Sequence, residues 1–116
     1  HDDHNAPDSS GVSPYAINSR DGIRVSTNDG YLEPARGRPN LTIQGDTVVD
    51  RICLDGSRAT GVVAVTPDGV REFQARETII ACGAIHSPAV LIRSGIGPAD
   101  EVKRLGITPV VDLPVG

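Results

Sequence analysis

Two Asp-Gly pairs, each set between short aliphatic runs, limit the fold of this chain more than any other feature. The pair at 55–56 lies between the runs 48–54 and 59–65, and the pair at 68–69 lies between 59–65 and 70–74. A tight hairpin built on a type I′ turn needs positive φ at both central residues, which Asp-Gly tolerates well. The spacing therefore predicts an antiparallel β-meander with type I′ turns.

The core of such a fold has to be aliphatic, because the 116 residues include one Phe, two Tyr and no Trp or Met. The 13 glycines and 9 prolines stay below the share of roughly 25–30% that marks low-complexity chains. The length allows one domain at most. We expect a turn-rich globular piece of the α/β class, or α+β when it is taken as an isolated piece.

Charge and hydropathy argue against two kinds of partner. Fifteen acidic residues against 11 basic ones give a net charge of −4, whereas nucleic-acid binding usually relies on a basic surface. The longest apolar runs fall far below the ~20 residues that span a bilayer. Neither a nucleic-acid partner nor a membrane span is expected. Cys53 and Cys82 lie inside apolar runs, as free thiols do, which favours a reducing, cytoplasmic compartment.

A polar arm or loop over residues 1–22 precedes a short helix. Ser26 and Asp29 have the spacing of a capping box, which predicts a helix over 26–32. Pro34 is expected to end this helix, because a proline disfavours continuation of the helical backbone.

The folded domain is expected to cover residues 23–116, with the β-meander at about 41–82. A short strand at 41–43 should begin it. The unbroken apolar run at 78–82 predicts a last strand that is buried on both faces.

Two helices are expected after the meander. Ser87 as N-cap and Pro88 as first helical residue predict a helix over 87–94. A second short helix over 100–105 should lead into an extended segment at 107–111.

Few residues suggest chemistry on their own. Residues 1–4 carry metal-ligand side chains, but a chain end is usually a solvated tail, so no metal site is expected. Ser87 already serves as a helix cap beside His86, so no triad and no other catalytic residue is predicted. Gly83 and Ala84 follow an apolar strand and precede a helix, where ligands often bind in α/β sheets. A plain packing crossover fits this turn equally well.

The segment 83–97, GAIHSPAVLIRSGIG, resembles the second signature of the glucose–methanol–choline (GMC) flavin oxidoreductases over its whole length. Three other segments, 24–32, 38–42 and 105–114, resemble further motifs of the same family. The resemblance therefore spans nearly the whole chain.

This resemblance implies part of an FAD-binding Rossmann-like domain with an antiparallel meander and short helices. It also implies an oxidoreductase that acts on CH–OH donors of the alcohol, choline or sugar type by hydride transfer to FAD. The family pattern places Val49 against the adenine ring through its backbone, and Gly83 and Ala84 near the cofactor. These three are the expected cofactor-binding residues.

The family's phosphate-binding glycine loop and its catalytic histidine are not among these residues, and the chain starts with His1. The resemblance thus implies an interior fragment that is inactive alone. Its partners would be the remainder of the flavoenzyme chain and a small-molecule alcohol substrate. A competing interpretation is a non-catalytic standalone or swapped-dimer module, derived from such an enzyme, that forms a homodimer through exposed strand edges.

Overall fold

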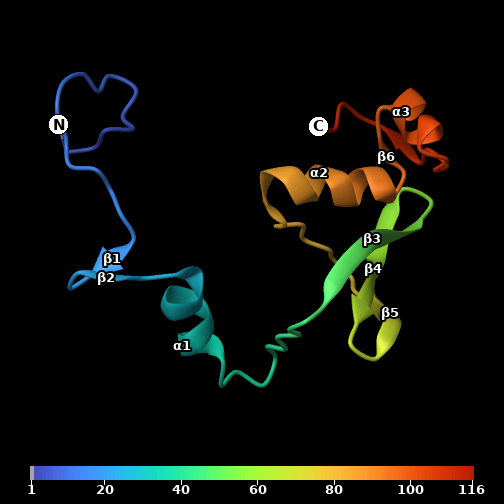
Figure 1. The fold of residues 1–116 in the computed structure, drawn as a ribbon, viewed down its shortest axis with the longest axis horizontal. Helices are drawn as coiled ribbons and strands as arrows, with labels where there is room; N and C mark the ends of the chain where they lie inside the picture. The colour runs from blue at the N-terminus through green and yellow to red at the C-terminus, as the bar shows by residue number, and fades with distance from the viewer. Residues whose placement is uncertain (1) are drawn as a thin grey trace. The chain divides into compact units, whose positions relative to one another are not determined.

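The computed structural model describes residues 2–116 and divides into two units (Figure 1). Unit 1 ends at Ile43, and unit 2 is Gln44–Gly116. Each unit is described by itself below. Within residues 2–116, none of the helices combines the length and the hydropathy that crossing a bilayer requires.

Unit 1 contains a small hairpin that was not predicted; it begins within the expected polar arm 1–22 and ends just after it. Strands β1 (Ser19–Arg20) and β2 (Ile23–Arg24) pair antiparallel. The turn between them is Asp21-Gly22, with φ values of 53° and 76°. Positive φ at both central residues is what a type I′ turn requires, so this Asp-Gly pair has the φ signs of a type I′ turn, although none was predicted here.

A helical segment follows the hairpin. It has a π-helical part, η1 (Asn28–Leu32), and a short α-helical part, α1 (Glu33–Ala35). The helix was expected to stop before Pro34, and this prediction is wrong. The proline lies in the first turn of α1, where its missing N–H costs no hydrogen bond of that α-helix.

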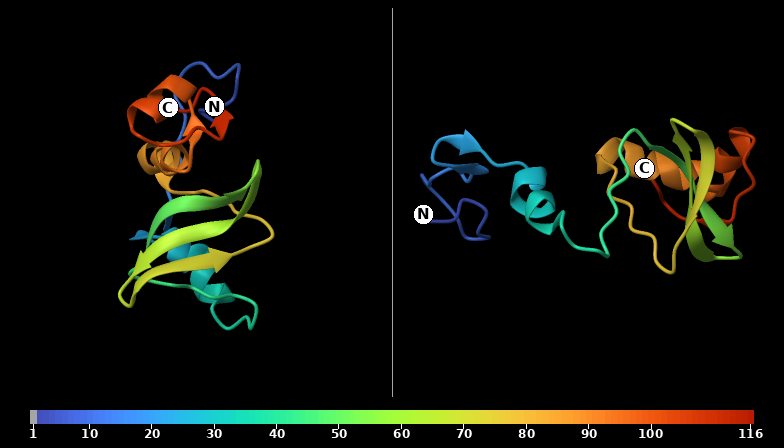
Figure 2. Two further views of the ribbon diagram at one scale, coloured as in Figure 1. Left: turned by 90° about the vertical axis from the view of Figure 1, so that its right-hand side faces the viewer. Right: turned by 90° about the horizontal axis from the view of Figure 1, so that it is seen from below.

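The predicted meander forms in unit 2. Strands β3 (Val48–Asp55), β4 (Arg58–Thr66) and β5 (Gly69–Gln74) form an antiparallel sheet in that order. Figure 2 shows them as one twisted sheet. The α/β class, with an antiparallel meander and short helices, is therefore confirmed.

The prediction that both turns of this sheet are of type I′ is wrong. In the β3–β4 turn the central residues are Gly56 and Ser57, and only Gly56 has positive φ, at 57°. In the β4–β5 turn, Pro67 and Asp68 are central, and neither has positive φ. Each Asp-Gly pair is thus shifted by one residue from the central positions that a type I′ turn needs.

Two helices and a short parallel strand pair complete unit 2. The elements are α2 (Gly83–Arg93), β6 (Ile96–Gly97), α3 (Ala99–Arg104) and β7 (Val111–Asp112), with β6 and β7 parallel. The buried core is aliphatic, as expected. It consists of Ile52, Val63, Ala64, Val90 and Val102.

Two predicted strands are wrong. Residues 41–43 and 78–82 lie in the described part of the chain, but neither segment is a strand. The apolar run 78–82 lacks a ladder partner among the described residues, and Ile79 is 83% exposed. Its apolar character therefore reflects a surface that this chain does not bury by itself.

The helix predicted over 87–94 begins one turn earlier, at Gly83, so Ser87 is not its N-cap and Pro88 lies inside it. The proline removes one intrahelical bond, the one from position 88 to the carbonyl of Ala84. The Ser87 Oγ instead accepts a hydrogen bond from the Cys82 N–H, at 3.0 Å. This bond ties the residue before the helix to its second turn.

Candidate functional site

Val49, the expected adenine-side residue, lies near the start of the edge strand β3. It pairs with Ala64 of β4, and a bulge at Asp50 shifts the register so that Arg51 pairs with Val63. A bulge leaves backbone groups outside the ladder. Among residues 2–116, β4 is the strand paired with β3, so the outer edge of β3 is open to other groups.

The C-terminal end of α2 contacts this outer edge. The Arg93 guanidinium donates from Nε to the Asp50 carbonyl at 2.7 Å and from Nη2 to the Val49 carbonyl at 3.4 Å. Arg93 Nε also lies 3.6 Å from the Asp50 carboxylate. The Arg93 side chain therefore holds both carbonyls at the bulge.

Ser94 makes a second link to the same strand. Its Oγ accepts a hydrogen bond from the Ile52 N–H at 2.8 Å and donates one to the Val90 carbonyl at 2.6 Å. Both Ser94 and Ile52 are buried. This hydroxyl satisfies a backbone N–H at the sheet edge that would otherwise be buried without a partner.

Gly83 and Ala84 form the opposite end of α2. Gly83 has φ +81°, and a Cβ placed on it would meet no described atom within 4 Å. No side chain of the described residues caps this end, and its first turn carries no acidic residue. Its free N–H groups and the helix dipole favour a negatively charged group.

The structure therefore places the three expected cofactor residues at two points and not at one. Val49 lies beside Arg93 at the end of α2, and Gly83 begins the helix. Ten residues at 1.5 Å each separate these ends by about 15 Å. Val49 and Gly83 are therefore associated with opposite ends of this helix.

The second half of the signature segment serves packing. A Cβ on Gly95, whose φ is +82°, would lie 2.6 Å from the Thr108 carbonyl. The Ala99 N–H at the start of α3 donates to Asp112 Oδ1 at 3.0 Å. The end of the segment 83–97 and the start of α3 are thus packed against residues 108–112.

Sequence reasoning missed Arg93 and Ser94. Both residues fall within the helix predicted over 87–94, and neither was expected to contact another element. Their partners in β3 lie more than 40 residues earlier in the chain. No local pattern in the sequence signals such a contact.

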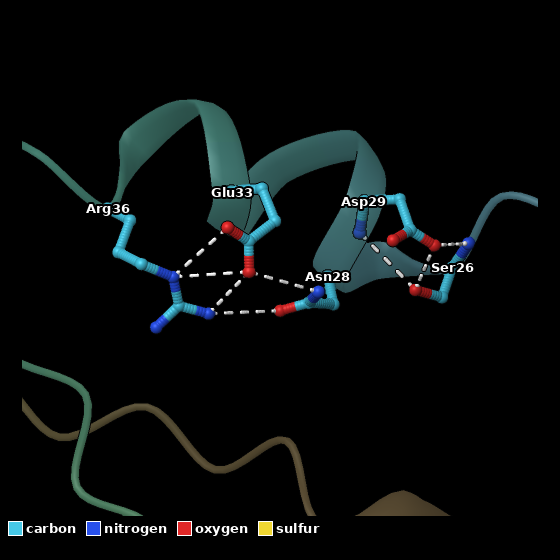
Figure 3. A network of polar contacts seen from close by, with 5 residues as sticks. All are labelled: Ser26, Asn28, Asp29, Glu33 and Arg36. Atoms are coloured by element: carbon cyan, nitrogen blue, oxygen red, sulfur yellow. Dashed lines mark hydrogen bonds and ion pairs between the residues drawn. The ribbon is translucent and has the colours of Figure 1, made fainter.

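Unit 1 holds a separate network of exposed polar side chains (Figure 3). Asp29 Oδ2 accepts hydrogen bonds from the N–H and the Oγ of Ser26, which completes the expected capping box. Glu33 pairs with Arg36 at 2.6 Å, and Asn28 contacts both.

These contacts change the protonation of the network. The Ser26 hydroxyl lowers the pKa of Asp29, and the Arg36 guanidinium lowers the pKa of Glu33. Both carboxyl groups are therefore ionised at neutral pH. A network of exposed and mutually paired side chains stabilises a helix end and presents no unpaired acid or base for catalysis.

The remaining candidates do not converge on one place. In the described residues no group of three or more His, Cys, Asp or Glu side chains is arranged to hold a metal ion. His4 stacks on Tyr15 with 5.4 Å between ring centroids. His86 is exposed on α2. Burial raises the pKa of the Cys53 thiol, which keeps it protonated at neutral pH.

The chain is similar in sequence to a known family of proteins. Over residues 1–116 the chain matches the family described as GMC oxidoreductase. An oxygen-dependent choline dehydrogenase of Pectobacterium atrosepticum is 47% identical over 94 residues, which are 80% of this chain and 17% of that enzyme. The chain spans about a fifth of the length of the curated relatives that it matches.

Solved structures agree with the family match. Pyridoxine 4-oxidase from Mesorbium loti is 40% identical, with a TM-score of 0.78 over 84% of this chain and 19% of that one. An FAD-dependent oxidoreductase from Chaetomium thermophilum is 32% identical, with a TM-score of 0.68 over 76% of this chain and 16% of that one. The family match over residues 1–116, supported by solved structures that cover 84% and 76% of the chain, shows that this chain belongs to the GMC oxidoreductase family.

Proposed function

We propose that this chain is part of an FAD-dependent oxidoreductase that acts on CH–OH donors of the alcohol, choline or sugar type. In it, the chain contributes an adenine-side contact from Val49 and a contact from Gly83 and Ala84 at the start of α2. Family membership supports the reaction class, as do relatives that are a choline dehydrogenase and an FAD-dependent oxidoreductase. The observation that carries the proposal is the open face of Gly83 at a helix end that no described side chain caps.

The residues at the two ends of α2 suit different parts of FAD. A strand residue such as Val49 presents an N–H and a C=O to the same side, which matches the donor and acceptor atoms on the edge of an adenine. The N–H groups at the start of α2 suit a negatively charged group, and Gly83 allows a close approach because it has no side chain. When bound, FAD supplies the acceptor for the hydride of the donor.

Further residues of the complete enzyme would supply the base that takes the hydroxyl proton of the substrate, so we expect this chain alone to be inactive. The exposed apolar residues support a partner surface of that kind. Ile79 is 83% exposed and Ile85 is 80% exposed, and both flank the start of α2. The free thiols of Cys53 and Cys82 support a cytoplasmic location.

The proposal is tested by Gly83→Ala in the complete enzyme, with Gly106→Ala as the matched control. Gly106 also has positive φ, at +77°, and a Cβ there would likewise meet no described atom within 4 Å. Both variants carry the same backbone strain, on the order of 1 kcal/mol. We expect Gly83→Ala to lose most of its bound FAD, because the new methyl group occupies the cofactor's side of the turn. Gly106→Ala should keep its FAD, and equal flavin content in both variants would contradict the proposal.

A second candidate function is the non-catalytic module that pairs with a second copy through a strand edge. It is favoured by β5, whose residues are all exposed, and by the apolar segment 78–82. Charged residues within β5, Arg71 and Glu72, oppose such pairing. Sedimentation of this chain separates the two functions: a stable dimer without flavin supports the module, and a folded monomer argues against it.

A further inference from the structure

We propose that Arg93 is a positioning residue for the adenine side of the cofactor, acting through the bulge in β3. The inference rests on the proposed function, because it concerns how Val49 is presented to FAD. Arg93 itself need not touch the cofactor. Its role is to hold the backbone that does.

The bulge is the weak point of this strand. Between Val49 and Arg51 the ladder loses its register, and β3 is an edge strand, so its backbone is held from one side by β4. Backbone that is not held by a ladder samples several φ/ψ combinations. Recognition of a flat ring edge by one N–H and one C=O needs a single backbone orientation.

Arg93 supplies the missing constraint. Its Nε donates to the Asp50 carbonyl at 2.7 Å, and its Nη2 reaches the Val49 carbonyl at 3.4 Å. The guanidinium is planar and donates from fixed directions, so two carbonyls held by it also hold the peptide between them. A carbonyl oxygen has two lone pairs, which leaves the Val49 carbonyl able to accept a second bond.

The carbonyl contacts are more important than the charge pair. Arg93 Nε lies 3.6 Å from the Asp50 carboxylate, and both side chains are 41% exposed. Exposed ion pairs of this kind contribute little. Asp50→Asn leaves the backbone carbonyl in place and should therefore change the affinity for FAD and ADP only slightly. Arg93→Leu, in contrast, removes all contacts that the guanidinium makes with Val49 and Asp50.

The experiment uses the complete enzyme, stripped of flavin, in four forms: wild type, Arg93→Leu, Asp50→Asn and Arg104→Leu. Arg104 is the matched control, because it pairs with Glu101 at 3.2 Å on the exposed face of α3 and loses the same charge away from β3. Three ligands are titrated against each form. They are FAD, ADP as the adenine half, and FMN as the flavin half. Arg93→Lys, which keeps the charge and loses the fork, replaces Arg93→Leu if the latter fails to fold.

We expect Arg93→Leu to weaken FAD and ADP binding by the same factor, about tenfold, the size of one lost hydrogen bond to a charged group. FMN binding should stay unchanged. Asp50→Asn should lose less than about fivefold and Arg104→Leu nothing measurable.

Two results would overturn the positioning role. One is unchanged affinity of Arg93→Leu for FAD and ADP. The other is an equal loss of FMN affinity, which would indicate general damage to the fold. A wild-type enzyme that binds no FAD would instead contradict the proposed function itself, so the two failures are distinguishable.

Discussion

The hydroxyl of Ser94 shows how much one small side chain contributes to this fold. It lies at the end of α2 and bonds the Ile52 N–H at 2.8 Å, and both residues are buried. The same hydroxyl donates to the carbonyl of Val90, which also accepts the Ser94 N–H at 3.1 Å. One oxygen atom thus gives the Ile52 N–H of the edge strand a hydrogen-bond partner and adds a bond to the last turn of α2.

Replacing this serine should loosen β3. Ser94→Ala leaves the buried Ile52 N–H without a partner, which costs about 1–3 kcal/mol of local stability. Hydrogen exchange followed by mass spectrometry on the peptide that covers β3 should then speed up by about 5- to 150-fold. Ser57→Ala, in the exposed β3–β4 turn, is the control. Unchanged exchange in Ser94→Ala would show that water or backbone replaces the hydroxyl.

At the scale of elements, those whose partners are close in the sequence were predicted correctly, and those whose partners are distant were not. The alternation and spacing in 48–74 predicted the meander, because strand pairing across short turns is fixed by neighbouring residues. The turn type was wrong, since a shift of one residue puts Gly56 at the first central position. The apolar run 78–82 predicted a strand, but apolar character signals burial and does not say which surface buries it.

Part of the candidate site could also be predicted from the sequence, and part could not. Val49 came from the resemblance alone, whereas the position between an apolar run and a helix had already pointed to Gly83 and Ala84. In the structure Gly83 and Ala84 begin α2, and Val49 lies in β3 within reach of the Arg93 side chain. Arg93 and Ser94 could not be predicted, because their contacts with β3 join residues more than 40 positions apart. The start of α2 was misplaced, since Pro88 usually marks the first turn of a helix and here lies inside one.

The helical segment 27–35 of unit 1 should depend on pH. The pKa values of Asp29 and Glu33 are lowered in the folded state, by Ser26 and Arg36 respectively. The ionised carboxylates therefore stabilise the segment at neutral pH, and that stabilisation is lost as the pH falls through the lowered values, below about pH 4.

Amide exchange over 27–35, corrected for its intrinsic dependence on pH, checks this expectation. Protection in the wild-type protein should fall between pH 5 and pH 3. Asp29→Asn should show lower protection at neutral pH and a smaller change on acidification. Asp68→Asn, in the β4–β5 turn, should behave as the wild type does. Equal pH responses of Asp29→Asn and the wild type would contradict the assigned role of the capping box.

At the scale of the whole molecule, α2 connects the two parts of the proposed cofactor site. Its start offers open N–H groups and the bare Gly83, and its end holds the bulge next to Val49. The two ends of α2 lie about 15 Å apart, a spacing that the proposed extended dinucleotide would span. The apolar residues near the start of α2 would face the remainder of the enzyme.

The decisive measurement is a crystal structure of the complete enzyme with its bound flavin. We expect an adenine nitrogen within about 3.2 Å of the Val49 backbone, and the same FAD molecule in van der Waals contact with Gly83 and Ala84. An FAD that contacts only Val49, or only Gly83 and Ala84, would contradict the role proposed for the other. An FAD bound away from all three residues would contradict the proposed function of this chain.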